Sequence, residues 1–282
     1  MTRKEFLRAA SLLGLGLPFY GHLAATGKER SNLEASKVII IGGGAAGLSA
    51  GFLLGKANVD YSILEAGTTY GGRKQVNKTF ADFPLPLGAE WITRNTLNFA
   101  PLADTREVLA QIETTTYTQD DLMSVWRDGK RYTRHETNFH YKKFVNSSWM
   151  EFFETFVVPA VQNKITYESV VKSVNYAGDK VVVTTDKETY EGSHVIVTAP
   201  LAMLHKGRIR FSPALPKRKQ ESITNTTVWA GFKAFFEFKE QFYPAFTDFV
   251  IEPATKGQIS YYDAAYGQRS NRHILGLFSV GK

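Results

Sequence analysis

The 282-residue sequence contains no cysteine, which excludes disulfide bonds, thiolate metal sites and a cysteine-linked cofactor within it. It has only 6 histidines and none in a close HxH or HExxH arrangement, so no metal site is predicted. The net charge of +7 is spread widely, with only residues 217–219 clustered, and this argues against nucleic-acid binding. By contrast, 43% hydrophobic and 13% aromatic residues suffice for the cores of about two domains.

The most informative segment begins with residues 38–41, a Val-Ile-Ile-Ile run typical of a parallel strand buried on both faces. Gly42 follows directly and predicts a tight turn. Gly44 would let the backbone approach a pyrophosphate, and Gly47 would let the next helix pack closely on the strand. The pattern therefore predicts a dinucleotide phosphate at the N-terminus of a helix.

A second strand, residues 60–64, ends at Glu65, which lies 18 residues beyond Gly47. A carboxylate at this distance suits the ribose hydroxyls of a dinucleotide and would repel a 2′-phosphate, which disfavours NADP. The Gly-Gly-Arg at 71–73 decides between dinucleotides, because Glu-Ala followed shortly by Gly-Gly-Arg resembles a flavoprotein signature. The alternative is an exposed turn with a solvated arginine.

These motifs resemble the flavin-containing amine oxidase family, which includes monoamine and polyamine oxidases. The resemblance continues in the family's order through residues 88–91 (Gly-Ala-Glu-Trp), 171–174 (Val-Lys-Ser-Val), 195–201 and 211–216. It implies an FAD cofactor and an α/β (α+β overall) fold. A Rossmann-like three-layer FAD domain with a parallel sheet would accompany a mixed or antiparallel substrate domain.

The resemblance also implies which residues bind the cofactor. They are Gly42, Gly44, Ala46, Gly47, Glu65, Ala66, Gly71, Gly72, Arg73, Gly88, Ala89, Glu90, Trp91, Val171 and Ala199.

A catalytic role is implied for Lys233. Residues 229–238 alternate as a strand whose one face is apolar, and Lys233 falls on the other face. In many family members a lysine at this place holds a water against flavin N5. The alternative is a strand lysine whose amine reaches solvent.

The FAD-binding domain is expected to be discontinuous, at residues 36–98 and 166–210, with the substrate domain at 99–165 and 211–282. Asp128-Gly129 predicts a β-hairpin in the first part of the substrate domain. A second hairpin is predicted between residues 170–176 and 180–185.

The N-terminus reads as an export signal over residues 1–25, with basic residues before a short apolar run at 9–20. It is similar to a twin-arginine signal in which Lys4 replaces the second arginine, and this predicts export to the periplasm. The alternative is an amphipathic helix or uncleaved anchor, although roughly 12 apolar residues are too few to span a bilayer.

The chain departs from the family at its C-terminus, because nothing after residues 276–282 supplies the segment that closes the family's cofactor site. The sequence therefore predicts a C-terminally truncated family member. We expect it to oxidise a small amine by hydride transfer to flavin, with oxygen as acceptor. The alternatives are a desaturase or dehydrogenase of the same superfamily, or a non-catalytic FAD-binding fragment completed by a second polypeptide.

Overall fold

The computed structural model describes residues 37–93, 102–103, 105–118, 121–135, 141–253 and 256–281. The chain divides into two compact units. Unit 1 comprises Met1–Gly72, Asn98–Asp104 and Phe153–Thr226, and unit 2 comprises Arg73–Leu97, Thr105–Phe152 and Thr227–Lys282. By packing, residues 73–97 belong to unit 2, whereas the predicted functional division assigns them to the FAD-binding domain. The predicted export signal lies outside the described residues.

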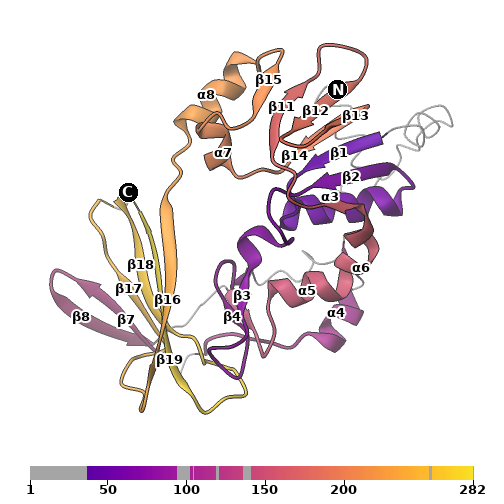
Figure 1. Cartoon of the computed structure of the whole chain (residues 1–282). Helices are drawn as coiled ribbons and strands as arrows, with labels where there is room; N and C mark the ends of the chain where they lie inside the picture. The colour runs from indigo at the N-terminus through magenta and orange to yellow at the C-terminus, as the bar shows by residue number, and fades with distance from the viewer. Residues whose placement is uncertain are drawn as a thin grey trace, which may run out of the picture. The chain divides into compact units, whose positions relative to one another are not determined.

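Unit 1 contains a parallel sheet in the order β10-β2-β1-β14. Its strands are β1 (Lys37–Ile41), β2 (Asp60–Leu64), β10 (Ile165–Thr166) and β14 (His194–Val197). Helix α3 (Ala45–Lys56) contacts β1 and β2 and buries Leu48, Leu53 and Leu54 (Figure 1). The predicted succession of strand, glycine turn, helix and strand is confirmed.

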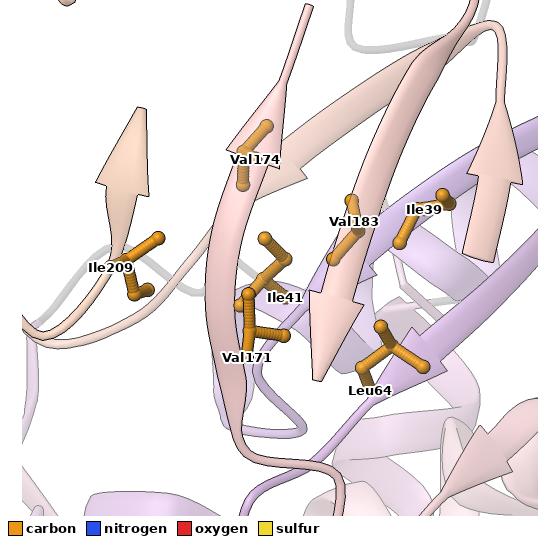
Figure 2. Close-up of a cluster of buried hydrophobic side chains, with 7 residues drawn as sticks. All are labelled: Ile39, Ile41, Leu64, Val171, Val174, Val183 and Ile209. Atoms are coloured by element: carbon orange, nitrogen blue, oxygen red, sulfur yellow. The ribbon is translucent and has the colours of Figure 1, made fainter. Parts of the chain in front are cut away.

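A second sheet covers the parallel sheet in unit 1, in the order β13-β12-β11-β15. Its strands are β11 (Val171–Asn175), β12 (Val181–Thr185), β13 (Thr189–Gly192) and β15 (Arg210–Ser212). Ile39, Ile41 and Leu64 pack against side chains of this second sheet in one buried cluster (Figure 2). The predicted three layers and the second hairpin, β11 with β12, are confirmed.

Short helices complete unit 1, and α5 crosses the division between the units. These elements are α5 (Trp149–Phe156), α6 (Val158–Val161), the 3₁₀ turn η3 (Gln162–Lys164), α7 (Leu201–His205) and α8 (Lys217–Asn225). None of the helices within the described residues is both long and apolar enough to cross a membrane.

Unit 2 is built on a six-stranded sheet in the order β16-β19-β18-β17-β7-β8. The strands are β7 (Leu122–Arg127), β8 (Lys130–His135), β16 (Ala230–Phe238), β17 (Phe246–Phe249), β18 (Gly257–Asp263) and β19 (His273–Gly281). Neighbours are antiparallel except β17 with β7. Asp128 and Gly129 have φ angles of 51° and 73°, which two-residue hairpin turns require, so the predicted β7-β8 hairpin is confirmed.

Smaller elements carry the rest of unit 2. They are β3 (Val76–Asn77), β4 (Leu85–Pro86), β5 (Ile92–Thr93), β6 (Thr114–Thr115), β9 (Tyr141–Phe144) and α4 (Thr105–Gln111), with the 3₁₀ turn η1 (Gly72–Lys74) at the division. Strand β9 pairs with both β5 and β6.

Strand β16 alternates as predicted, but its more apolar face is the exposed one among the described residues. Phe232 and Phe236 are 59% and 45% exposed, whereas Phe235 packs against the core that contains Tyr262. Lys233 shares the face of Phe235. Alternation identifies two faces, but which one is covered depends on the elements that pack against the sheet.

Candidate functional site

The turn between β1 and α3 is shaped by glycines. Gly42 has a φ angle of +109°, a region that L side chains rarely adopt. A Cβ atom on Gly47 would lie 1.8 Å from the Gly42 carbonyl oxygen. Both positions therefore need glycine, because a side chain at Gly42 would strain the backbone and one at Gly47 would force the helix away from the strand.

The N-terminus of α3 is open to an anion. Gly44 is its N-cap, makes no side-chain cap hydrogen bond, and precedes a first turn that contains no acidic residue. A Cβ atom on Gly44 would meet no other atom within 4 Å. The first N–H groups of the helix and the open space at Gly44 suit a phosphate.

Thr198, which directly follows β14, fixes this turn, and the sequence did not identify it as a site residue. Its hydroxyl donates to the carbonyl oxygen of Ile41 at 2.8 Å and lies 3.1 Å from that of Gly42. Thr198 falls within the segment 195–201 that resembles the family. Its contact with the turn depends on the parallel pairing of β1 and β14, which no local pattern reveals.

Glu65 lies at the end of β2, beside the same turn. Its Oε2 atom accepts a hydrogen bond from Gly43 N at 2.6 Å, and its Oε1 atom accepts one from Gly67 N at 2.8 Å. Each carboxylate oxygen can accept a further bond, so ribose hydroxyls can bind without displacing the backbone. Glu65 directly follows β2, as expected, and ribose binding by its carboxylate stays a prediction.

The second glycine turn packs against the first. Gly71 N donates to the Gly43 carbonyl oxygen at 2.9 Å, and Gly71 forms a β-bridge with Gly44. Gly72 has a φ of +56°, and a Cβ atom on it would lie 3.3 Å from Gly44 Cα. The two predicted turns are thus brought together in unit 1, as binding of one pyrophosphate by both would require.

The remaining predicted cofactor-binding residues of unit 1 differ in how exposed they are. Ala46 and Ala66 are exposed, whereas Val171 is buried in the core between the two sheets and Ala199 packs against that core.

Three candidates in unit 2 meet through their backbones. Ala89 N donates to the Arg73 carbonyl oxygen at 2.9 Å. A Cβ atom on Gly88 would lie 1.9 Å from that same oxygen, so the approach of the two segments needs glycine. The Arg73 side chain is exposed.

Glu90 and Lys233 form a buried ion pair in unit 2. Lys233 Nζ lies 2.6 Å from Glu90 Oε2, and the two side chains are 6% and 4% exposed. The Lys233 amine therefore does not extend into solvent, which rules out the solvent-exposed alternative. Tyr262 OH donates to the same carboxylate oxygen at 2.7 Å, and Lys143 Nζ lies 3.3 Å from Glu90 Oε1.

Charge interactions in this cluster outweigh burial for Glu90. Burial alone would raise the pKa of Glu90, but Lys233, Lys143 and the hydrogen bond from Tyr262 lower it below its usual value. Burial lowers the pKa of Lys143 despite the opposing charge of Glu90. Burial and the charge of Glu90 raise the pKa of Tyr262 well above its usual value.

Trp91 places its ring among aromatic side chains of unit 2. Its centroid lies 5.7 Å from that of Tyr262 and 6.0 Å from that of Tyr117. Lys143 and Tyr262 complete the cluster around Glu90, yet the sequence reasoning missed both. They belong to β9 and β18, far from Glu90 in sequence, so only sheet pairing brings them together.

Metal binding finds no support in the part of the chain that the structure describes. No group of three or more His, Asp or Glu side chains there could hold an ion.

Two family models match the chain. "Flavin containing amine oxidoreductase" matches residues 155–280, and "NAD(P)-binding Rossmann-like domain" matches residues 40–104. Together they include both glycine turns and Lys233.

Curated relatives match shorter stretches. Human lysine-specific histone demethylase 2 is 38% identical over 28% of this chain and 10% of its own length. Mouse lysine-specific histone demethylase 1B is 29% identical over 42% and 15%, and polyamine oxidase 7 of Oryza sativa subsp. japonica is 32% identical over 30% and 18%. The matched stretches thus span less than a fifth of these relatives.

Solved structures share the fold. Wild-type putrescine oxidase bound to putrescine has a TM-score of 0.69 at 14% identity, covering 88% of this chain and 76% of that one. Cyclohexylamine oxidase from Brevibacterium oxydans has a TM-score of 0.69 at 12% identity, covering 87% and 75%. The two family matches, the shared fold and the glycine turns beside Glu65 support a flavin-containing amine oxidase family member, for which FAD is the implied cofactor.

Proposed function

We propose that the chain is an FAD-dependent oxidoreductase. It would oxidise an amine by hydride transfer to flavin N5, with oxygen as the final acceptor. The observation that carries this proposal is the pair of adjoining glycine turns beside Glu65. An open helix N-terminus, a site for ribose hydroxyls and a second glycine turn together fit a dinucleotide.

In this proposal α3 and Gly44 hold the pyrophosphate, and Glu65 accepts hydrogen bonds from ribose. Arg73, Gly88 and Ala89, in unit 2, are proposed as cofactor-binding residues from the family resemblance alone. Bound FAD would supply the hydride acceptor, and the protein would bind and orient the amine and exclude water.

Lys233 is the proposed catalytic residue of unit 2. Its side chain is buried, and its Nζ is held 2.6 Å from the Glu90 carboxylate. A fixed ammonium group can donate a hydrogen bond to an ordered water or to a group that gains negative charge. We assign no general acid or base, because an acid–base residue is not needed for hydride transfer from a neutral amine.

The substrate proposal rests on the relatives. One solved neighbour is described as bound to putrescine and another as a cyclohexylamine oxidase. We therefore propose a small amine, with a C–C desaturase or dehydrogenase of the same superfamily as the alternative.

A second candidate is an FAD-binding fragment that needs another polypeptide. The exposed apolar residues Phe232 and Phe236 favour it, because a contiguous apolar face is normally covered.

The absorption spectrum of the purified chain tests these proposals. Flavin bands at near-stoichiometric content that bleach with putrescine or cyclohexylamine and recover in air would support the oxidase. Bleaching that recovers only with an artificial electron acceptor would indicate a dehydrogenase. A colourless chain that added FAD does not stabilise against heat would contradict FAD binding by the isolated chain.

We also propose that residues 1–25 direct export through the twin-arginine route. Fusing residues 1–30 to a reporter that functions only after folded translocation tests this. Translocation that does not depend on Arg3 and Lys4 would indicate another route.

A further inference from the structure

The Glu90 carboxylate is shared by two buried lysines that differ in how many protein acceptors each one has. Lys143 Nζ lies 3.3 Å from Glu90 Oε1 and donates to the carbonyl oxygens of Asp263 at 3.1 Å and Ala264 at 3.3 Å. An ammonium group has three N–H donors, so protein acceptors satisfy all three. Lys143 is therefore a fixed cation.

Lys233 has fewer protein acceptors than Lys143. Within the described residues its Nζ has two acceptors, Glu90 Oε2 at 2.6 Å and the Pro86 carbonyl oxygen at 3.3 Å. One N–H donor of this ammonium group is left for a water or ligand. In the part of the chain that the structure describes, Lys143 thus has three protein acceptors for its three N–H donors, whereas Lys233 has two.

The surroundings of Lys143 also fix its position. It lies on β9, its residue is 3% exposed, and its Nζ lies 5.4 Å from the ring centroids of both Trp91 and Tyr262. The two carbonyl acceptors belong to the last residue of β18, Asp263, and to the residue after it, and the pairing of β18 with β19 fixes the backbone at Asp263. The position of Lys143 therefore does not depend on Glu90 alone.

We infer that Lys143 is a positioning residue that orients Glu90, so that Glu90 binds Lys233 through one oxygen only and leaves a Lys233 N–H available. With Lys143 on Oε1, the carboxylate cannot turn both oxygens toward Lys233. Without Lys143, Oε1 would lose its partner, and Glu90 could bind Lys233 with both oxygens and occupy the remaining donor. This role for Lys143 rests on the proposed function of Lys233.

The first test follows Glu90 itself and needs no cofactor. Carboxyl-¹³C NMR of glutamate-labelled protein, with the Glu90 signal assigned by its loss in Glu90→Gln, reports the pH at which Glu90 titrates. Besides the two lysines, the titratable groups around this pair are Tyr262 and Tyr117, which face Glu90, and Asp263, which faces Lys143.

Lys143→Met should raise the Glu90 titration midpoint by about one pH unit, because one of two nearby cations is lost. Lys180→Met is the matched control, since Lys180 pairs with Glu191 on the surface, and it should leave the midpoint unchanged. An unchanged midpoint in Lys143→Met would overturn the inference. Lys143→Gln, which keeps a donor for the backbone carbonyls, serves if the methionine variant does not fold. Failure of both to fold would assign Lys143 to fold stability instead.

The second test concerns Lys233 and uses the FAD-loaded chain. Lys143→Met should lower kcat about tenfold while FAD affinity stays within about twofold, and it should add nothing further to Lys233→Met. Additive losses would show that Lys143 acts independently of Lys233. A wild-type chain that binds no FAD would contradict the proposed function, whereas the Glu90 titration would still decide the role of Lys143.

Discussion

The ring of Tyr262 packs against the backbone of Gly276 on the neighbouring strand. The two residues are cross-strand partners in β18 and β19, and a Cβ atom on Gly276 would lie 2.6 Å from the tyrosine ring. Because the hydroxyl of this ring donates to Glu90, the glycine sets one side of the buried charge cluster.

Gly276→Ala should therefore displace Tyr262 and destabilise the fold by about 1–3 kcal/mol through overpacking. Urea unfolding measures this, and near-ultraviolet circular dichroism reports the aromatic environment. Gly178→Ala is the control, because a Cβ atom there would meet nothing within 4 Å. Equal stability of the two variants would show that the strand yields without cost.

Two alanine substitutions in the first glycine turn should differ in their effects on protein stability and on FAD binding. Gly47→Ala brings a Cβ atom to 1.8 Å from a backbone oxygen and should cost more than about 2 kcal/mol together with FAD binding. Gly44→Ala meets no protein atom within 4 Å, so it should keep the stability but weaken FAD binding by occupying the space for pyrophosphate. Denaturant titration and FAD fluorescence quenching measure the two effects. Undiminished FAD affinity in Gly44→Ala would place the pyrophosphate elsewhere.

Glu65→Gln should weaken both the turn and the binding of ribose. An amide has one acceptor oxygen, so the N–H of either Gly43 or Gly67 loses its partner, at a cost of about 1–3 kcal/mol. FAD affinity should fall as well, because the ribose hydroxyls lose a charged acceptor. Isothermal titration with FAD checks this, with Glu168→Gln as the exposed control. Wild-type affinity in Glu65→Gln would contradict ribose binding at this carboxylate.

Glu90 should make the fold sensitive to acid. Its pKa is lowered in the folded chain, so its contribution is complete above the unfolded value of about 4.3 and is lost as pH falls through the lower folded value. Glu90→Gln should remove this part of the acid dependence. It should also cost about 3 kcal/mol at pH 7, since two buried ammonium groups lose their counter-charge.

Urea unfolding of the wild type and of Glu90→Gln between pH 3 and 7 measures how the free energy of unfolding depends on pH in each protein. Glu237→Gln is the control, because the Glu237 pair with Arg272 lies at the surface and should matter much less. A Glu90→Gln variant whose stability follows the wild-type pH profile would exclude Glu90 as the source of the acid dependence.

Lys233→Met should leave FAD content intact while slowing flavin reduction or reoxidation. The substitution keeps the buried chain length but removes the ammonium group that pairs with Glu90. Stopped-flow absorbance with an amine, followed by exposure to air, measures both half-reactions. Wild-type rates in both would remove Lys233 from the mechanism.

Local sequence was enough to predict the nucleotide-binding elements of unit 1. The strand, the glycines at 42, 44 and 47, the helix and Glu65 are close in sequence, and their geometry depends on backbone conformations that only particular residues allow. The Asp128-Gly129 hairpin was predictable for the same reason, because the turn selects residues that tolerate positive φ.

The composition of the charge cluster around Glu90 depends on tertiary packing and could not be predicted from local sequence. Glu90, Lys143, Lys233 and Tyr262 come from four separate segments, and strand pairing and packing in unit 2 bring them together. Tertiary packing also decided that the Lys233 face of β16, and not its more apolar face, is buried. Local sequence specifies backbone conformation and alternation, whereas burial and charge pairing depend on contacts between segments distant in the chain.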